Sequence, residues 1–333
     1  MDAPENILLI RLKSIGDLAF TLPAVNAVRA NFPSAKITFL TSSENAPLLG
    51  GFPAVDEVIS LDRRRLRAGH PFRAASALFA LLRRLRAGGF SLVVDFQGYG
   101  ETAWLSWWTG APVRWGAVYA PGREWLYTRG IPRDSRLHPA RWNLLLLRQC
   151  GLKIENVKNY FCPPPAAMQA AARFFAAQHL DAARPTVFFQ PLTSSPHKNW
   201  PLENYLALAR HWRSRGAQII FCGGPADGAR LEPARAEGFC VATDLPLDVS
   251  AALAALCRLI VAGDTGIAHF AVAAGRPVVM VMAGGGPGLC VPFQHPEWAV
   301  APQPGSGIST VPVSAVLAAA ETALNEPGDN AVC

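Results

Sequence analysis

Three segments of the chain place polar side chains directly after apolar runs. The first, Ser14-Ile15-Gly16-Asp17, follows the apolar stretch Ile7–Leu12 and precedes a helical pattern. A carboxylate at a helix start can cap free amide groups and meet the positive end of the helix dipole. It also lies at the carboxyl end of a predicted strand, where open parallel sheets bind their ligands. Asp17 is therefore either a capping residue or a catalytic base, in a loop that includes Ser14 and Gly16.

The second segment places hydroxyl groups and one lysine between a predicted strand and a predicted helix. Thr193, Ser194 and Lys198 follow the strand at Thr186–Gln190 and precede Pro201, which suits the first turn of a helix. Hydroxyls, free backbone amides and an ammonium group in this place can surround a phosphate. A single lysine in a loop is also common at an ordinary solvent-exposed surface, so this segment alone leaves phosphate binding open.

The third segment, Asp264-Thr265-Gly266, turns from the predicted strand Leu259–Ala262 into a helix. The free amides at such a helix start form an anion site without a lysine. His269 lies about one turn further along the same face of the helix. The alternative is an ordinary capped helix with a histidine in the core.

Several catalytic motifs are missing from the sequence. It has no phosphate-binding loop of the Walker type, and no Gly-x-Gly-x-x-Gly follows the first strand, which disfavours NTPases and dinucleotide enzymes. No Gly-x-Ser-x-Gly supports a hydrolase. No aspartate has another aspartate two positions away, so the Asp-x-Asp metal motif of many nucleotide-sugar enzymes is absent. We therefore expect no metal site and no cofactor.

The elements that position these residues alternate between short β-branched runs and helical stretches, which favours parallel sheets with crossover helices. The three prolines Pro163 to Pro165 can continue neither a helix nor a central strand, so they predict a linker. We expect two α/β halves, residues 1–160 and 161–333, with a ligand in the cleft between them. The predicted strands are Ile7–Leu12, Lys36–Thr41, Glu57–Leu61, Leu92–Phe96, Thr186–Gln190, Ala217–Cys222, Phe239–Ala242, Leu259–Ala262 and Pro277–Met282. The predicted helices span 17–31, 72–88, 101–109, 166–179, 202–214, 248–257, 266–274 and 312–325.

The net charge of +7 is concentrated in the first half. Residues 1–160 hold 21 Lys or Arg against 12 Asp or Glu, and the remainder holds 10 against 12. The blocks Arg63–Arg67 and Arg83–Arg86 carry much of the excess. They could bind an anionic acceptor, an anionic membrane surface or only solvent. Nucleic acid is not expected as a partner, because the basic blocks lack interleaved aromatic residues and no nucleic-acid-binding module is visible.

The segment between residues 99 and 141 is irregular in pattern and rich in tryptophan. Trp104, Trp107, Trp108 and Trp125 lie within it. Clustered tryptophans more often pack against one another than stack on ligands, so we expect packing and leave the role of residues 104–127 open.

The N-terminus carries Lys13 and Asp17 within its first apolar stretch, which is unlike a secretory signal peptide. No run free of charges is long enough for a membrane-spanning helix, because glycines interrupt the uncharged stretch after Pro277. We expect a cytoplasmic protein.

Taken together in this order, the three polar segments resemble glycosyltransferase family 9, the ADP-heptose:lipopolysaccharide heptosyltransferases. The likeness is strongest in residues 7–40, and it recurs in Lys198-Asn199-Trp200-Pro201 and in residues 264–271. The resemblance implies the GT-B fold, an α/β architecture of two Rossmann-like parallel-sheet domains facing across a cleft. Residues 1–160 would bind the acceptor, and residues 161–333 would bind the nucleotide-sugar donor.

The resemblance also implies roles for single residues. Asp17 would be the general base, and Lys198 would neutralise the leaving diphosphate with help from Thr193 and Ser194. Asp227 falls where the family has an acidic residue that binds the adenosine ribose. The remaining donor-binding residues would be Asp264, Thr265, Gly266 and His269.

The implied reaction is a metal-independent, inverting transfer of heptose from an ADP-sugar to the lipopolysaccharide core of a Gram-negative bacterium. The acceptor would be an anionic glycolipid, and peripheral contact with the cytoplasmic face of the inner membrane is an open expectation. Two alternatives remain. One is a GT-B glycosyltransferase with another nucleotide sugar or acceptor, and the other is a non-catalytic nucleotide- or carbohydrate-binding protein, which would not need a base.

Overall fold

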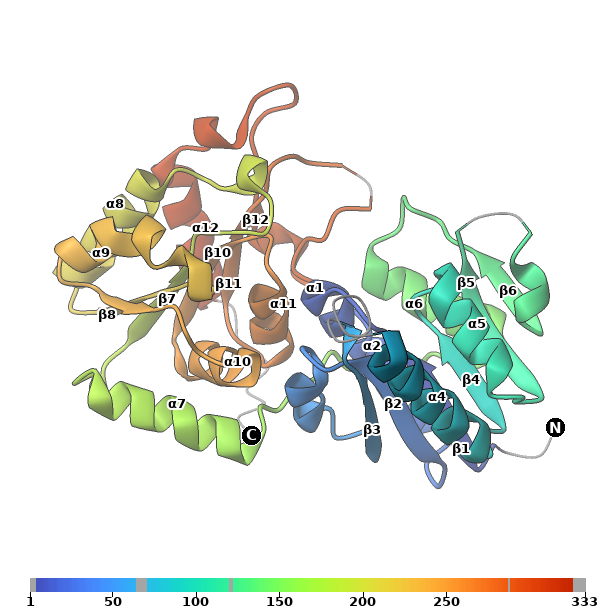
Figure 1. Ribbon diagram of the computed structural model, residues 1–333. Coiled ribbons are helices and arrows are strands. Elements are labelled where there is room, and N and C mark those ends of the chain that lie inside the picture. Colours follow the sequence, from blue (N-terminus) through green and yellow to red (C-terminus); the bar gives the residue numbers. More distant parts are fainter. Residues whose placement is uncertain (1–3, 64–70, 120–121, 287, 326–333) are drawn as a thin grey trace. The chain divides into compact units, whose positions relative to one another are not determined.

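The computed structural model describes residues 4–63, 71–119, 122–286 and 288–325 (Figure 1). The chain divides into two compact units, Met1–Tyr160 (unit 1) and Phe161–Cys333 (unit 2). Each unit is built on one six-stranded sheet, and every strand pairing in both sheets is parallel. The strands are nearly continuous apolar runs because helices cover both faces of a parallel sheet.

In unit 1 the strand order is β3-β2-β1-β4-β5-β6. The register aligns Ile10 with Leu40 on one side and with Asp95 on the other, so β1 is a central strand between β2 and β4. The direction of winding reverses between β1 and β4, which makes the carboxyl ends of these strands the switch point of the sheet. The strands are β1 (Asn6–Ile10), β2 (Lys36–Ser42), β3 (Glu57–Leu61), β4 (Leu92–Asp95), β5 (Val113–Val118) and β6 (Arg129–Pro132).

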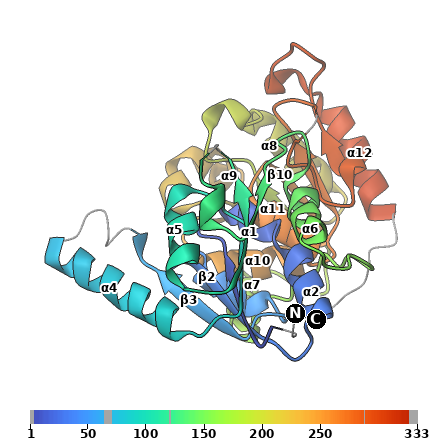
Figure 2. The ribbon, with the colours of Figure 1, turned by 90° about the vertical axis from the view of Figure 1, so that its right-hand side faces the viewer.

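Two pairs of helices lie on the two faces of this sheet (Figure 2). On one face, Leu81 and Leu85 of α4 and Leu105 of α5 pack into a core with Leu8 and Val93 of the strands. On the other face, α2 and α6 pack against each other. The helices are α1 (Ile15–Ala19), α2 (Leu22–Asn31), α4 (Pro71–Ala87), α5 (Gly100–Trp108) and α6 (Pro139–Gln149).

Unit 2 repeats this winding with the strand order β12-β11-β10-β7-β8-β9. Its switch point lies between β7 and β10, which pair directly, with Ala262 opposite Gln190. The strands are β7 (Thr186–Gln190), β8 (Gln218–Cys222), β9 (Cys240–Ala242), β10 (Leu259–Gly263), β11 (Val278–Val281) and β12 (Ala299–Val300). The α-helices are α7 (Pro165–Ala177), α8 (Leu202–Ser214), α9 (Glu232–Ala236), α10 (Leu247–Leu256), α11 (Gly266–Ala273) and α12 (Val313–Asn325).

The structure adds α9 and β12, which were not predicted, and it differs from the predicted elements of unit 1 in two further places. The single helix predicted from Asp17 to Asn31 is two helices, because Pro23 has no amide hydrogen to continue α1 and instead lies in the first turn of α2. The irregular segment between residues 99 and 141 contains β5, β6 and the start of α6. The apolar run of β5 is interrupted by Arg114 and Gly116, which weakens its strand signal.

The tryptophans of this segment differ in their exposure to solvent. Trp115 is buried, whereas Trp104, Trp107, Trp108 and Trp125 are exposed to between 40% and 58%, so the packing prediction holds only in part. Of the basic blocks, Arg64, Arg65 and Arg67 lie outside the described residues. Among the helices that the structure describes, none has both the length and the apolar character needed to cross a membrane.

Candidate functional site

Asp17 lies at the switch point of unit 1, in the loop and helix that follow β1. Ser14 is the N-cap of α1, and its hydroxyl accepts the Asp17 amide at 3.4 Å. In return, the Ser14 amide and hydroxyl each donate to Asp17 Oδ2 at 3.1 Å. This reciprocal arrangement is a capping box, so Asp17 does take part in capping α1.

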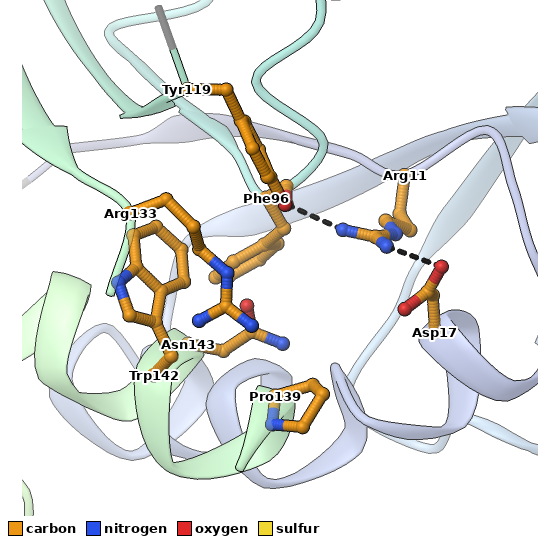
Figure 3. Close-up of a pocket in the computed structure, with 8 residues that line it drawn as sticks. All are labelled: Arg11, Asp17, Phe96, Tyr119, Arg133, Pro139, Trp142 and Asn143. Carbon is orange, nitrogen blue, oxygen red and sulfur yellow. Dashed lines mark hydrogen bonds and ion pairs between the residues drawn. The ribbon is translucent and has the colours of Figure 1, made fainter. Parts of the chain in front are cut away.

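Arg11 supplies a further contact that capping does not require. Its Nη2 lies 2.6 Å from Asp17 Oδ2, and its Nη1 donates to the Phe96 carbonyl at 2.6 Å (Figure 3). The Arg11 side chain is only 8% exposed, whereas that of Asp17 is 35% exposed. The buried arginine thus holds a carboxylate that faces solvent.

All these donors reach one oxygen of Asp17. Within the described residues no group donates a hydrogen bond to the other oxygen, Oδ1, which points in Figure 3 towards the side where Asn143 and Arg133 lie. Burial raises the pKa of Asp17, but the Arg11 charge and the hydrogen bonds from Ser14 and Arg11 outweigh it, so this pKa is below its usual value. The carboxylate is therefore ionised at neutral pH and has one oxygen available to accept a proton.

A buried polar cluster positions the loop that carries Asp17. Gln97 Oε1 accepts the amides of Leu12 and Lys13, both at 3.1 Å. Asp95, at the end of β4, accepts the amides of Gln97 and Gly98 at 2.9 and 3.0 Å. The fully buried Asp95 thereby fixes Gln97, and Gln97 fixes the chain just before Asp17.

Asp95 is itself anchored from the edge of the sheet. The hydroxyl of the buried Tyr127 donates to Asp95 Oδ2 at 2.7 Å. Burial raises the pKa of Asp95 even though these donors favour its charged form. A β-carbon on Gly98, which has a φ of +68°, would lie 2.3 Å from the Ala117 carbonyl oxygen, so only glycine fits this turn.

A small pocket opens beside Asp17 (Figure 3). Arg133 is stacked over the ring of Trp142, with its guanidinium carbon 4.6 Å from the ring centroid. Asn143 is held by a hydrogen bond to the Phe20 carbonyl at 2.9 Å. Pro139 at the first turn of α6 also lines the pocket, so two arginines and a helix N-terminus give it a positive character. Its lining residues are Arg11, Asp17, Phe96, Tyr119, Arg133, Pro139, Trp142 and Asn143.

The switch point of unit 2 brings Lys198 and Asp264 together. Lys198 follows β7, Asp264 follows β10, and Lys198 Nζ donates to Asp264 Oδ2 at 2.8 Å. The Lys198 side chain is 40% exposed and that of Asp264 is 17% exposed. The hydrogen bond from Lys198 to Asp264 raises the pKa of the lysine despite its partial burial, so the ammonium group is charged at neutral pH.

His269 and Thr265 complete this region. His269 is buried in α11, and its Nε2 lies 3.4 Å from Asp264 Oδ1. Burial raises the pKa of Asp264, but hydrogen bonds from His269 and Lys198 bring it below its usual value. Thr265 is the N-cap of α11, yet its hydroxyl caps nothing, and this buried oxygen has no hydrogen-bond partner among the described residues. Gly266 begins the helix, so its amide is one of the free donors at this end.

The loop after β7 is folded by its own hydrogen bonds. Asn199 Oδ1 accepts the Thr193 amide at 2.8 Å, and the Thr193 hydroxyl donates to the Ser195 carbonyl at 2.9 Å. Ser194 is exposed beside them. A β-carbon on Gly263 would lie 2.7 Å from the Thr193 methyl group, so glycine at the end of β10 allows the two loops to approach closely.

Asp227 lies after β8, the strand next to β7. Its Oδ2 accepts the Gly224 amide at 2.8 Å, and its Oδ1 is 3.3 Å from Arg230 Nη1. The structure therefore uses Asp227 to close its own turn, and ribose binding by this residue stays a prediction.

Apart from Ser14, the residues that hold Asp17 and its loop were not predicted from the sequence. Arg11, Asp95 and Gln97 are the main ones, and Arg133 and Asn143 add the pocket. One signal was available for two of them, because Arg11 is a charge next to an apolar strand and Asp95 ends the run Leu92-Val93-Val94. Buried polar groups need hydrogen-bond or ion-pair partners, so these residues are expected to make specific contacts within the fold.

Known proteins share the sequence pattern and the fold. The profile of glycosyltransferase family 9 (heptosyltransferase) matches residues 78–300. A lipopolysaccharide heptosyltransferase 1 of Escherichia coli is 26% identical over 316 residues, which cover 93% of this chain and 95% of that protein. Among solved structures, a family 9 glycosyl transferase from Veillonella parvula has a TM-score of 0.85 at 23% identity, covering 97% of this chain and 98% of that one. An E. coli heptosyltransferase with ADP-2-deoxy-2-fluoro heptose has a TM-score of 0.75 at 23% identity, covering 95% and 99%.

Two Rossmann-like units with parallel sheets, together with these structural neighbours, define the GT-B fold. The α/β GT-B prediction is thus confirmed. Because the family profile spans more than half of the chain, the chain belongs to glycosyltransferase family 9, and it is a glycosyltransferase.

Proposed function

We propose that this protein transfers a heptose from an ADP-sugar to a lipopolysaccharide core acceptor, with inversion and without a metal ion, and with Asp17 as the general base. The observation that carries the proposal is the state of Asp17, a half-buried, ionised carboxylate with one oxygen held by Arg11 and Ser14, while the other oxygen accepts no hydrogen bond from the described residues. The similar E. coli protein is a lipopolysaccharide heptosyltransferase, which supports the choice of sugar and acceptor.

In the proposed reaction, Asp17 Oδ1 takes the proton from the acceptor hydroxyl while the oxygen of that hydroxyl attacks the anomeric carbon of the donor sugar. Arg11 does not react, because it is buried and bound to Oδ2 and to the Phe96 carbonyl. It keeps the carboxylate ionised and fixes its orientation. General-base catalysis of this kind typically contributes about 10²–10⁴ in rate.

The donor side of the reaction belongs to unit 2. Lys198 and the N-terminus of α11 supply the positive charge that a leaving diphosphate needs. The Thr265 hydroxyl and the Gly266 amide donate to no group among the described residues, so both suit phosphate oxygens. We assign Thr193 and Ser194 to the same phosphates, Asp264 and His269 to the positioning of Lys198 and the turn, and Asp227 to the ribose.

The acceptor side belongs to unit 1. The pocket beside Asp17 presents Arg11, Arg133 and the N-terminus of α6, so it suits an acceptor with an anionic group near the reacting hydroxyl. An anionic glycolipid meets this requirement. We place the protein in the cytoplasm, in peripheral contact with the inner membrane that holds such an acceptor.

The test is a panel of nucleotide sugars offered to the purified protein in the presence of a chelator. We expect ADP-heptose to bind, and to be transferred or slowly hydrolysed, in preference to UDP- and GDP-linked sugars. A preference for a UDP- or GDP-sugar would overturn the heptose assignment and leave a GT-B glycosyltransferase of other specificity. Activity that vanishes with the chelator and returns with Mg²⁺ would overturn the metal-independent mechanism. Tight donor binding without any turnover on lipopolysaccharide core acceptors would favour a non-catalytic binding protein.

A further inference from the structure

An exposed aromatic face on unit 1 has no role in the reaction described above. Trp104 and Trp107 on α5 and Trp125 in the 3₁₀ turn Glu124–Leu126 form a cluster of edge-to-face rings, with centroids 5.3 to 6.4 Å apart. Each of these rings is exposed to between 40% and 58%. Soluble proteins rarely expose contiguous apolar surface on this scale unless it is an interaction site.

The face continues from α5 onto α4, which lies beside it (Figure 2). Trp108 Nε1 donates to the Leu82 carbonyl at 3.1 Å and so ties the two helices together. An open groove between them is lined by apolar side chains and one carboxylate: Leu78, Leu81, Leu82, Trp104, Leu105, Trp108 and Glu101. The carboxylate is already paired, because Glu101 is 3.0 Å from Arg63.

Beyond the groove, α4 carries a basic and aromatic stripe. Phe79 is 68% exposed, and Arg83 and Arg86 follow it at spacings of four and seven residues, which places the three on one side of the helix. Helix α4 contains no acidic residue. Arg84 is paired with Glu57 of β3, whereas Arg83 and Arg86 make no ion pair within the described part of the chain.

We propose that this face, made of α4, α5 and the turn around Trp125, docks on the surface of an anionic lipid bilayer. Indole rings with one apolar side and one polar N–H favour the level of the lipid headgroups, and arginines on the same face meet the negative charge of the lipids. The groove between α4 and α5 then lies against the acyl region. This inference rests on the proposed function in one respect, because only that function makes the acceptor a glycolipid. The docking itself does not depend on the sugar transferred.

Charge argues for a lipid surface over a second copy of the chain. A symmetric dimer through this face would bring Arg83 and Arg86 of one copy towards those of the other, which like-charge repulsion opposes. An anionic membrane instead offers a continuous negative surface to all of them.

The first test measures binding of the full-length protein to vesicles by flotation. We expect binding to phosphatidylglycerol/phosphatidylethanolamine vesicles, weaker binding in high salt, and at least about tenfold weaker binding to pure phosphatidylcholine. Tryptophan emission should shift to the blue, and lipids brominated in the acyl chain should quench it. Equal binding to both vesicle types, or no binding, would overturn the proposal.

Variants then locate the docking face. Trp104→Ser combined with Trp125→Ser should weaken vesicle binding by about tenfold or more and remove most of the blue shift. Arg83→Glu combined with Arg86→Glu should weaken it by about fivefold or more at low salt. The matched controls are Arg173→Glu, an exposed arginine of α7, and Leu256→Ser, an exposed leucine of α10, and both should bind like the wild type. If the control variants bound vesicles as weakly as the variants of the docking face, or if the variants of the face bound like the wild type, the assignment would be wrong.

Two further measurements separate this inference from its rivals. Sedimentation should show the same oligomeric state with and without the tryptophan substitutions, and a dimer that they dissociate would make the face a protein interface instead. Transfer to a water-soluble, deacylated acceptor should be unchanged in the tryptophan variant, while transfer to acceptor embedded in vesicles should fall by about tenfold. If no acceptor supports transfer by the wild type, the proposed function fails, but the vesicle-binding result still decides the docking face.

Discussion

The switch points of the two units hold the same kind of ion pair with its exposure reversed. In unit 1 the cation is buried and the carboxylate faces solvent, with 8% of Arg11 and 35% of Asp17 exposed. In unit 2 the carboxylate is the more buried partner, with 17% of Asp264 and 40% of Lys198 exposed. In each pair the buried partner orients and the exposed partner presents its charge. One winding of the chain therefore offers a negative group at one switch point and a positive group at the other.

This difference suits a transfer reaction, because the attacking group and the leaving group need protein charges of opposite sign. The attacking hydroxyl must lose a proton to a base, and the leaving diphosphate must be stabilised by a cation. The comparison predicts that removing an exposed partner costs rate directly. Removing a buried partner should act indirectly, through the pKa or the position of the exposed one.

The largest effect is expected from Asp17→Asn, which keeps the shape of the side chain but removes the base. We expect kcat to fall by about 10²–10⁴ with donor affinity unchanged, measured by steady-state kinetics and calorimetry. Ser14→Ala is the matched control, because it removes the two hydrogen bonds of the Ser14 hydroxyl and leaves the carboxylate bound to Arg11 and to the residue 14 amide. It should cost about 1 kcal/mol of stability and little rate. Turnover retained by the Asn variant would remove Asp17 from the mechanism.

Lys198→Ala should have the next largest effect, because it removes the exposed cation of unit 2. Loss of a fixed charge at the leaving group should lower kcat by about 10²–10³ and also weaken nucleoside diphosphate binding. Arg173→Ala, which removes an exposed charge elsewhere in the same unit, should change neither. If the two variants behaved alike, the assignment of Lys198 to the diphosphate would be wrong.

The buried partner of unit 1 can be tested with Arg11→Met. Arg11 holds the pKa of Asp17 below its usual value, and burial opposes it, so without Arg11 this pKa rises. The acid limb of kcat/KM should move to higher pH while the rate near neutral pH changes much less. The same pKa change also alters how the free energy of unfolding depends on pH. The lowered pKa contributes stability above the unfolded-state pKa of about 3.9, which is lost as pH falls through the folded pKa, so the variant should lose less stability on acidification.

Arg133→Met is the control for this pH profile, since Arg133 lines the same pocket but lies over Trp142, while the ion pair of Asp17 is with Arg11. It should raise the KM for an anionic acceptor without moving the acid limb. An acid limb that stays in place in the Arg11 variant, or moves equally in both, would show that the buried arginine does not set the pKa of the base.

The sequence predicts the switch point of unit 2 better than that of unit 1, because Lys198 and Asp264 are both candidates from the sequence, whereas Arg11 is not. Asp17 and Lys198 could be found because they follow apolar strands in turn-forming loops, and the parallel architecture follows from the same alternation. Arg11 and Gln97 could not be assigned, because their partners lie 6 and 85 residues away from them, and only the pairing of β1 with β4 brings Gln97 to the Leu12 amide. The exposure of Trp104 could not be predicted either, since it depends on which side of α5 the sheet covers.

The smallest effect should come from Thr265→Val, which tests whether the Thr265 hydroxyl binds the donor substrate. Because the Thr265 hydroxyl is buried and bonds to no described residue, its removal should not lower the unfolding temperature. If it donates to a phosphate, the Kd for ADP should rise about fivefold, the ordinary value of one hydrogen bond. Thr310→Val is the matched control, because the Thr310 hydroxyl donates to the Gly307 carbonyl at 2.8 Å, so this variant should lose stability and keep its ADP affinity. A Thr265 variant that unfolds earlier and binds ADP normally would mean that the hydroxyl serves the fold, and the positive switch point would then depend on Lys198 and the helix amides alone.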